Sequence, residues 1–510
     1  MLHTNIGKLY QYSATLKEGF LLFPVFSATF VRIVRCIMVW KVALNLLWWL
    51  IVLGTVLNIV FDKGDSGRKA AWILIIVVLP FLGLFLYLCF GVNLRHHWLF
   101  NRRHQRFKDL LDEYRLDDVL FDPSGYESVQ EEYRPLAWLL ASASGLPPAE
   151  GNRFEVIRSG ARKFELLMQD LEQARESIHM EYFRFGADKG SQAVRDLLIK
   201  KAQEGVKVRV INENIGNLYV RARHWERMRK AGIEVVKFTN PRTQLVRLIT
   251  RLNHRNHRKI VVVDGKIGYT GGMNLNDHYF HQWKDTHLRI LGPAVAQLQF
   301  IFMDSWVTAG GQLDRPFDTY FSRGDEVPGK VMQIVPDEPD NPLPLLQLSY
   351  IWGLLHARRY FWLQTPYFLP PEPLFDALKA AAASGIDVRV ILPRHVDTAL
   401  MRPANKAYYQ ECLESGIRIY LREGTFVHSK TFVTDDYLSS IGTANVDARS
   451  FSINYEDNAY IFDRESALEM KAAFEAELAE SQELTEADTA AFPWYSRLWQ
   501  KFVRLFAPLL

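Results

Sequence analysis

The fold of this 510-residue chain is decided by two short stretches of sequence that repeat each other. The first begins at His257 and reads H-R-K-I-V-V-V-D, and the second begins at His428 and reads H-S-K-T-F-V-T-D. After six further residues the first is followed by G-G-M-N, starting at Gly271, and the second by G-T-A-N, starting at Gly442. The histidine, lysine, aspartate, glycine and asparagine of the first copy each lie 171 residues before their counterparts in the second.

The repeat extends to an acidic residue and to an upstream segment. Asp285 and Glu456 each lie 28 residues after the histidine of their copy, and G-V-K-V-R-V from Gly205 matches G-I-D-V-R-V from Gly385. A single H-x-K-x4-D string occurs by chance in many chains, but two copies with further polar positions at equal spacing indicate a duplication. Because packing repeats preserve apolar residues, a repeat of polar ones points to a functional site.

The sequence around both copies predicts an α/β fold. Residues 207–211 and 259–263 are rich in Val and Ile and predict buried strands, and residues 191–205 predict a helix between them. Such alternation is typical of a mixed β-sheet with helices on both faces. We therefore expect two halves, residues 150–335 and 336–488, related by a pseudo-twofold axis and joined near residues 336–342.

Within each copy, the histidine and the lysine two positions later project to the same face of a strand. A pseudo-twofold arrangement would bring two histidines, two lysines and two asparagines around one tetrahedral anion. Lysine ammonium groups and asparagine amides donate to phosphate oxygens. The expected phosphate-binding residues are Lys259, Asn274, Lys430 and Asn445.

Two histidines can divide the work of a transfer reaction between a nucleophile and a general acid/base. Asp285 and Glu456 are the expected partners of the second ring nitrogens, which would fix each tautomer. Asp264 and Asp435 complete the two His-Lys-Asp sets, and we expect them to brace the site through ion pairs. The predicted catalytic residues are His257, Lys259, Asp264, His428, Lys430 and Asp435.

Composition narrows the function classes. The chain carries 61 Lys and Arg against 57 Asp and Glu, a net charge of +4, which excludes a polybasic nucleic-acid coat. Its three cysteines cannot build a disulfide framework or a zinc cluster. No cluster of carboxylates or cysteines and no G-x-x-x-x-G-K loop appears, so we expect neither a metal nor another cofactor.

The N-terminal region predicts a membrane anchor. Residues 42–61 and 70–92 carry no charge and are each long enough, as helices, to cross a hydrocarbon core of roughly 30 Å. With the polar turn 62–69 they predict a transmembrane hairpin, for which a pair of buried core helices is the alternative. We expect residues 1–41 to lie at the membrane interface, with a third span within 20–40 as the alternative.

Basic residues flank this hairpin on both sides, and residues 93–149 form a basic juxtamembrane linker in the prediction. By the positive-inside rule both ends, and the whole body of the chain, lie in the cytoplasm. Residues 489–510 predict an amphipathic helix on an anionic membrane surface, with a helix docked on the protein's own core as the alternative. Its expected apolar face comprises Trp494, Tyr495, Leu498, Trp499, Phe502, Val503, Leu505 and Phe506.

The paired H-x-K-x4-D motifs resemble those of the phospholipase D superfamily over roughly residues 150–480. The hairpin, N-H-R-K at 256–259, I-G-T-A-N at 441–445 and N-Y-E at 454–456 are similar to bacterial cardiolipin synthases. The resemblance implies a two-step transfer at the bacterial inner membrane, from phosphatidylglycerol through a phosphatidyl-histidine to a second phosphatidylglycerol. It implies that His257 is the nucleophile and His428 the acid/base, although sequence symmetry leaves the reverse assignment open.

Other functions share these residues. A phospholipase D-type hydrolase differs only in using water as the acceptor, and another phosphatidyltransferase would use a different alcohol, such as phosphatidylethanolamine. A nuclease of the same superfamily is disfavoured by the membrane hairpin and the modest net charge. A membrane scaffold would not require both His-Lys pairs. The sequence does not determine the oligomeric state.

Overall fold

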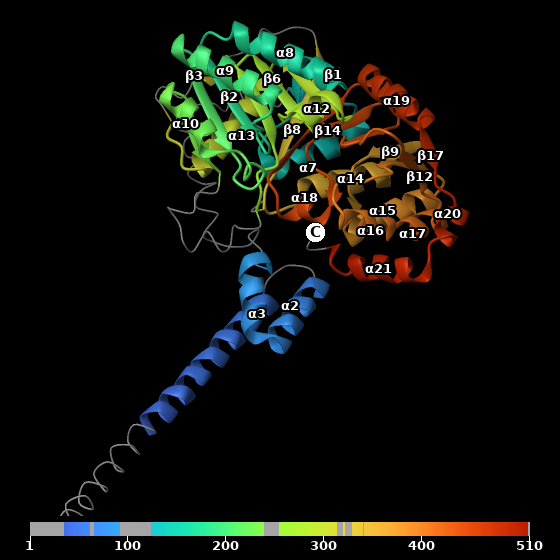
Figure 1. Ribbon diagram of the computed structural model, residues 1–510. Coiled ribbons are helices and arrows are strands. Elements are labelled where there is room, and N and C mark those ends of the chain that lie inside the picture. The colour runs from blue at the N-terminus through green and yellow to red at the C-terminus, as the bar shows by residue number, and fades with distance from the viewer. Residues whose placement is uncertain are drawn as a thin grey trace, which may run out of the picture. The chain divides into compact units, whose positions relative to one another are not determined.

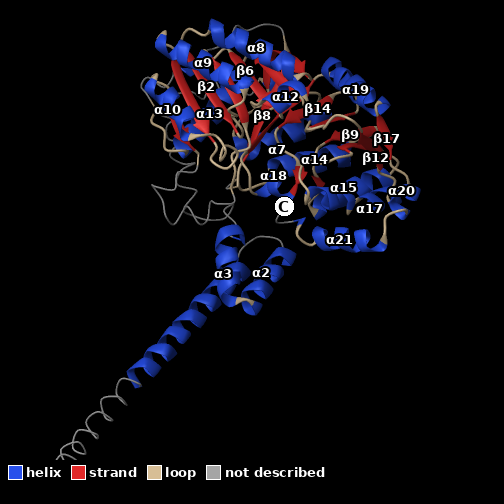
Figure 2. Ribbon diagram, in the orientation of Figure 1, coloured by secondary structure: helices blue, strands red, loops and turns tan. Residues whose placement is uncertain are grey.

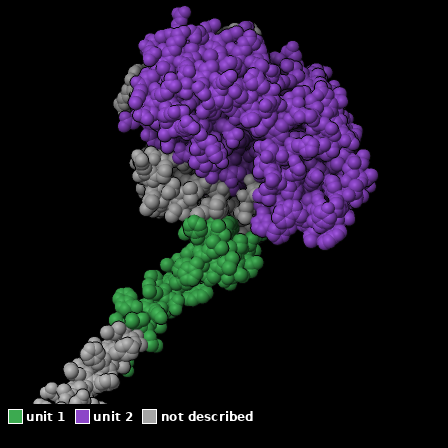
Figure 3. All heavy atoms as spheres, in the orientation of Figure 1, with its two compact units in different colours: residues 1–91 green, residues 92–510 purple. Residues whose placement is uncertain are grey.

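The computed structural model describes residues 35–61, 66–91, 124–238, 254–313, 320–321, 329–339 and 341–507. The chain forms two compact units, residues 1–91 and residues 92–510 (Figure 3). Residues 1–34, the turn 62–65 and residues 92–123 lie outside the described residues. Most of the predicted interfacial segment and most of the basic residues used to orient the hairpin therefore fall there.

The described part of unit 1 includes a helix, Arg35–Phe61, whose 27 residues are long and apolar enough to cross a membrane. At 1.5 Å per residue this helix is about 40 Å long. It contains the first predicted span, 42–61, and residues 35–41, which were expected at the membrane interface, belong to the same helix. Most of its large apolar side chains are exposed, as expected for a helix that contacts lipid.

The second apolar run, predicted as one membrane-spanning helix over 70–92, is not a continuous α-helix. It forms α2 (Ser66–Val78), α3 (Pro80–Leu86) and a π-helical turn, η1 (Tyr87–Gly91). The helix breaks before Pro80, which has no backbone N–H to donate and whose ring crowds the preceding turn. Beyond the break α3 packs back on α2, since a Cβ atom at Gly83 would lie 2.6 Å from the carbonyl oxygen of Ile75.

Unit 2 begins earlier than predicted. Residues 124–149, expected to belong to the juxtamembrane linker, form α6 (Gly125–Ser128), the 3-10 turn η3 (Glu131–Tyr133), α7 (Arg134–Ser144) and the start of β1. Leu136, Ala137 and Leu140 of α7 are fully buried. The α7 helix ends at Gly145, whose φ of 71° is accessible to glycine without strain. Residues 124–149 therefore belong to the folded body of unit 2, because α7 supplies part of its apolar core.

A single mixed sheet runs through unit 2 (Figure 2). The first half contributes β1 (Ala149–Ile157), β2 (Ser177–Tyr182), β3 (Lys207–Asn212), β4 (Glu234–Lys237), β5 (Lys259–Val263), β6 (Ile267–Gly271) and β7 (His287–Leu291). The second contributes β8 (Lys330–Asp337), β9 (Tyr360–Gln364), β11 (Asp387–Pro393), β12 (Arg418–Arg422), β13 (Thr431–Thr434), β14 (Leu438–Gly442), β16 (Glu456–Phe462) and β17 (Ser481–Glu483). Two short strands, β10 (Phe368–Leu369) and β15 (Val446–Asp447), pair separately.

The strand order reveals the duplication. From the outer edge inward the first half reads β4-β3-β2-β5-β6-β7-β1, and the second reads β12-β11-β9-β13-β14-β16-β8, with β17 added outside β12. The halves join where β1 and β8 pair antiparallel, with Ala149 opposite Met332. This arrangement confirms the predicted pseudo-twofold. The boundary expected at 335/336 falls inside β8, which opens the second half.

Helices cover both faces of the sheet, as predicted (Figure 1). On one face, α13 (Ala294–Thr308) and α19 (Arg464–Ala479) share an apolar core that runs through both halves. On the other, α8 (Gly160–Gln173) and α9 (Lys189–Gln203) cover the first half, and α14 (Leu345–His356) and α15 (Glu372–Ala383) cover the second. Shorter helices are α10 (Ala222–Lys230), α12 (Asp277–His281), α16 (Met401–Lys406), α17 (Tyr409–Glu414), α18 (Ala448–Ser452), α20 (Glu486–Ala490) and α21 (Trp494–Arg504).

Candidate active site

Each copy of the repeated motif contacts the opposite half of unit 2. His257 and Lys259 stand at the start of β5, and His428 and Lys430 just before β13. The backbone N–H of His257 donates to the carbonyl of Tyr455 at 2.9 Å, and that of His428 to the carbonyl of Lys284 at 2.7 Å. The two contacts are related by the same 171-residue offset, so the site lies at the junction of the halves.

The carboxylates that hold the imidazoles are exchanged between the halves. Nδ1 of His257 lies 2.9 and 3.1 Å from the two carboxylate oxygens of Glu456, at the start of β16. Nδ1 of His428 lies 2.7 Å from Oδ2 of Asp285, just before β7. The 28-residue spacing relates each acid to the histidine of its own copy, whereas each acid contacts the histidine of the other copy.

The two lysines extend from the strands toward their histidines. The ammonium of Lys259 donates to the carbonyl of His257, and that of Lys430 donates to the carbonyl of His428. Nζ of Lys430 also lies 2.7 Å from Nδ1 and 3.1 Å from Nε2 of His428. Both lysines are buried. Positive charge is therefore concentrated beside the imidazoles.

The two asparagines have different surroundings. The Oδ1 atom of Asn274 accepts from the backbone N–H of Arg184, and its amide donates to the hydroxyl of Tyr279 at 2.8 Å. That hydroxyl lies 3.3 Å from Nδ1 of His428. Among the described residues, the buried Oδ1 of Asn445 has no hydrogen-bond partner. The structure thus builds Asn274 into the hydrogen-bonding network around His428.

Burial dominates the electrostatics of the site. It lowers the pKa of His257 to about 4, against the opposing charge of Glu456, and lowers that of His428 well below its usual value with help from Lys430. It also lowers the pKa of Lys430 to about 7 and raises that of Asp285 to about 7. An anion between the lysines would offset their desolvation. The site is therefore suited to a phosphate group.

The motif aspartates are not part of this cluster. The carboxylate of Asp264 accepts three hydrogen bonds of 2.8–2.9 Å from the backbone N–H groups of residues 175–177, and Asp435 accepts three from residues 358–360. Both adopt a φ of 51°. They lie beyond the far ends of β5 and β13. Because β5 has five residues, Asp264 is roughly 17 Å from Lys259 along the strand. They brace the fold through backbone hydrogen bonds instead of the expected ion pairs.

Sequence reasoning missed Arg258, the residue between His257 and Lys259. Its guanidinium is fully buried and donates to Glu338 at 2.7 Å, to Ser305 at 3.0 Å and to the carbonyl of Glu456 at 3.2 Å. It thereby ties the first motif to the second half. A charged residue at the beginning of an apolar strand was the available signal, since such groups are buried only when paired.

Tyr279 was missed as well. Its ring lies edge-on to that of His428, with centroids 5.3 Å apart, and burial keeps its phenol protonated by raising its pKa well above 10. The corresponding residue of the second copy, 171 positions later, is Ser450. The repeat could not reveal Tyr279, because this position differs between the two copies. The surroundings of His257 and His428 are therefore not equivalent.

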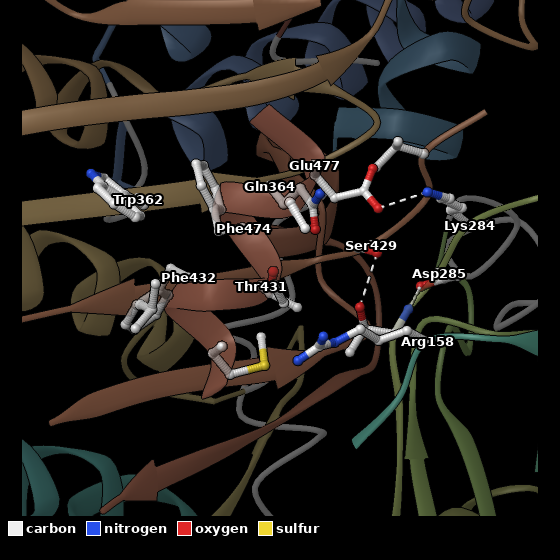
Figure 4. Close-up of a pocket in the computed structure, with 16 residues that line it drawn as sticks. Arg158, Lys284, Asp285, Trp362, Gln364, Ser429, Thr431, Phe432, Phe474 and Glu477 are labelled. Carbon is white, nitrogen blue, oxygen red and sulfur yellow. Dashed lines mark hydrogen bonds and ion pairs between the residues drawn. The ribbon is translucent and has the colours of Figure 1, made fainter. Parts of the chain in front are cut away.

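The reverse face of the second motif is also hollowed. Ser429 and Thr431 alternate with His428 and Lys430 and point into a cavity of about 150 Å³ beneath α19 (Figure 4). Lys284 and Glu477, which line this cavity, form an ion pair of 2.9 Å. Among the described residues, no three His, Cys, Asp or Glu side chains are grouped so that they could hold a metal ion, here or elsewhere.

Comparisons with known proteins agree with this geometry. The family model described as "Cardiolipin synthase, PLD-like domain" matches residues 167–306 and 350–478, and a model described as "Phospholipase_D-nuclease N-terminal" matches residues 43–91. The major cardiolipin synthase ClsA of Bacillus subtilis is 34% identical over 485 residues, covering 92% of this chain and 99% of its own. A cardiolipin synthase of Listeria monocytogenes serotype 4b is 32% identical, covering 92% and 100%.

The fold also has a solved counterpart. The crystal structure of phosphatidylserine synthase from Haemophilus influenzae superimposes with a TM-score of 0.54 at 15% identity, covering 74% of this chain and all of that chain. At this identity the likeness concerns the fold alone. The sequence relatives cover nearly their full lengths and carry the stronger inference. This chain therefore belongs to the bacterial cardiolipin synthases, a family of phosphatidyltransferases within the phospholipase D superfamily.

Proposed function

We propose that this enzyme transfers a phosphatidyl group from one phosphatidylglycerol to another, giving cardiolipin and glycerol. The observation that carries the proposal is the pair of imidazoles, each held by a carboxylate of the opposite half beside a buried lysine. The named relatives support the product, since they are cardiolipin synthases. The donor lipid and the covalent intermediate are the parts that need testing.

In the first step, Nε2 of His257 attacks phosphorus and the bond from phosphorus to the glycerol oxygen breaks. Burial holds the pKa of His257 at about 4, so its imidazole is neutral at pH 7 and has a free electron pair. Glu456 on Nδ1 directs that pair to Nε2, and among the described residues no hydrogen-bond partner lies on Nε2. These features favour His257 as the nucleophile.

His428 gives its proton to the departing glycerol oxygen. Its pKa is lowered by burial and by the charges of Lys430 and Lys259, so a bound phosphodiester anion, which offsets those charges, would raise it. In the second step His428 takes the proton from the head-group hydroxyl of a second phosphatidylglycerol. That oxygen attacks phosphorus, the phosphorus–nitrogen bond breaks, and His257 is regenerated.

We further propose that the enzyme acts on anionic membrane lipid, not nucleic acid, at the bacterial cell membrane. Helix Arg35–Phe61 supports a membrane span, and Arg35 and Lys41 support a cytoplasmic N-terminal end of that span by the positive-inside rule. The catalytic unit then lies in the cytoplasm only if the second apolar run, residues 66–91, returns the chain across the membrane. The multi-pass topology remains a prediction, because α2 and α3 have 13 and 7 residues and neither would cross a bilayer alone.

The test uses the full chain, purified in detergent and supplied with phosphatidylglycerol alone. Mass spectrometry should find cardiolipin and an equal amount of glycerol, and neither with His257→Ala. His356→Ala, an exposed histidine on α14, is the matched control and should be fully active. If phosphatidic acid were the sole lipid product, the enzyme would be a hydrolase and not a synthase. If a lipid product formed only after phosphatidylethanolamine was added, phosphatidylethanolamine would be the acceptor.

The order of the histidines needs a second experiment. Rapid acid quenching followed by peptide mapping should place the phosphatidyl adduct on His257. His428→Ala should accumulate that adduct if a substrate with a better leaving group than glycerol is used. The first step then needs no general acid, whereas the second step still needs His428 as its base. An adduct on His428 in the unmodified enzyme would reverse the assignment.

A further inference from the structure

Helix α21 turns most of its apolar side chains toward the outside of the catalytic unit and a polar side chain toward its inside. Its polar residue Gln500 is only 6% exposed, whereas Leu505, just beyond its end, is 75% exposed. Of the predicted apolar face, only Val503 turns inward and is buried. The outward side chains are Trp494, Tyr495, Leu498, Trp499, Phe502, Leu505 and Phe506.

Polar contacts fix this orientation. The guanidinium of Arg504 donates to Glu411 of α17 at 2.7 Å and lies over the ring of Tyr408 at 4.5 Å. Nearby, the ammonium of Lys406 in α16 lies over the ring of Phe492. Figure 1 shows α21 beside α16 and α17, and these contacts lock it to the catalytic unit. The helix is thus held through Arg504 and the buried Gln500 and Val503, while among the described residues its aromatic side is exposed.

A second apolar feature lies at the edge of the sheet that carries the active site. Asn212, the last residue of β3, pairs with Tyr182, which in turn pairs with Lys259 of the first motif. The loop that follows β3 therefore starts beside the site. Its tip exposes Leu218 by 66% and Tyr219 by 95%, together with Ile215.

This loop is built rigidly. The amide of Asn217 donates to the carbonyls of Phe183 and Glu213, and its Oδ1 accepts from the N–H of Phe185 at 2.8 Å. The Glu213 carboxylate accepts from the N–H of Gly216 at 2.7 Å. Because these hydrogen bonds fix the loop, its apolar tip is held away from the protein surface and can insert into an apolar environment.

The second half repeats the arrangement. Leu400 is exposed after β11, the counterpart of β3, and Leu343 is exposed after β8, whose Asp337 pairs with Glu456 of the site. Helix α16 follows Leu400 directly and contacts α21. Ile215, Leu218, Tyr219, Leu343 and Leu400, which we call the apolar rim, therefore share the active-site edge with α21.

We propose that α21 and the apolar rim form one membrane-docking surface, which seats the catalytic unit on an anionic bilayer with its active-site edge toward the lipid. Aromatic and leucine side chains with basic neighbours are typical of helices that lie in the bilayer interface. Arg497 and Lys501 flank the aromatic stripe of α21 and are exposed, so they can contact anionic head groups. The lipid phosphates would then reach the histidines without leaving the interface.

This surface deepens the proposed function, on which its biological role rests, but it can be tested without turnover. Cys36, Cys89 and Cys412 are first replaced, and single cysteines are introduced by Leu498→Cys, Leu218→Cys and, as a control, Lys230→Cys. Lys230 is an exposed residue at the end of α10, by the opposite edge of the sheet. Each full-length protein is labelled with an environment-sensitive fluorophore and reconstituted in bilayers of phosphatidylcholine and phosphatidylglycerol.

We expect brominated lipids to quench the labels at residues 498 and 218 at least threefold more than the label at residue 230, and aqueous iodide to show the opposite order. Equal iodide quenching at all three positions would overturn the proposal. Labels shielded from iodide but not quenched by brominated lipid would instead indicate a second copy of the chain on this surface, which also overturns it. If a labelled variant fails to fold, Leu505→Cys and Tyr219→Cys provide the same comparison. Since no product is measured, loss of activity and loss of docking are distinguishable.

Discussion

Replacing Glu456 with glutamine tests whether the carboxylate of one half prepares the nucleophile of the other. The side chain is fully buried, with its two oxygens 2.9 and 3.1 Å from Nδ1 of His257, and Oε1 also accepts from the amide of Asn454 at 3.0 Å. Glu456→Gln keeps this shape but removes the charge. It also offers an N–H to Nδ1, which favours the tautomer whose Nε2 carries the proton and cannot attack phosphorus.

The magnitude follows from these contacts. A hydrogen bond to a charged group contributes about 1.5–3 kcal/mol, which corresponds to roughly 10- to 150-fold in rate. The unfavourable tautomer adds to this, so we expect kcat to fall by about 10²–10⁴-fold. The KM should change little, because this carboxylate contacts the imidazole and not the lipid. A merely structural role would affect folding and both kinetic constants together.

The assay is the rate of glycerol release from phosphatidylglycerol by purified enzyme. Glu456→Asp keeps the charge and should recover part of kcat, and Glu469→Gln, on the exposed side of α19, should match the unmodified enzyme. Thermal unfolding of each variant checks the fold. If Glu456→Gln kept kcat within threefold of the unmodified enzyme, the positioning role inferred from the exchange of carboxylates would be refuted.

Three further substitutions probe polar side chains that hold the fold or the site together. Burial raises the pKa of Asp285 from 3.8 to about 7. Between pH 4 and 7 the folded protein therefore keeps a proton that the unfolded chain releases. The free energy of unfolding falls by on the order of 4 kcal/mol as pH rises through that window. Asp285→Asn should therefore raise Tm at pH 8 but not at pH 4, and an equal change at both would contradict this. Asp264→Ala should lose about 2–4 kcal/mol of unfolding free energy in denaturant titrations, with kcat unchanged. Asp264→Asn should lose less, because asparagine tolerates a positive φ. A large fall in kcat would instead make Asp264 a catalytic residue. Arg258→Met leaves Glu338 and buried acceptors without their donor and should cost about 3–5 kcal/mol by the same titration, and a loss below about 1 kcal/mol would refute its role in joining the halves.

Local sequence patterns predicted much of the fold. Residues 207–211 and 259–263 were expected to be strands and form β3 and β5, because runs of Val and Ile fit a sheet buried on both faces. The repeat predicted two related halves, which the strand order confirms. The break at Pro80 was harder to predict, since proline is tolerated in membrane helices and only the packing of α3 on α2 shows that the chain turns back there.

The duplicated polar residues also selected the candidate site. A duplicated site needs the same chemical groups in both copies, so His257, Lys259, His428 and Lys430 stand out against an apolar background. The direction of α21 could not be predicted in this way. Periodicity defined its two faces, but which face packs inward depends on acceptors such as Glu411, which lies far away in sequence.

The sequence by itself determined the duplication, the α/β class, the apolar N-terminal helix and the residue types of the site, because each is encoded in local patterns or in their repetition. Only the tertiary structure decided which carboxylate meets which histidine, that Asp264 and Asp435 bond to backbone far from the histidines, and that Arg258 ties the halves together. These contacts join residues as far as 199 positions apart, as between His257 and Glu456. They depend on the antiparallel junction of β1 and β8, which sets one half against the other and which no local pattern specifies.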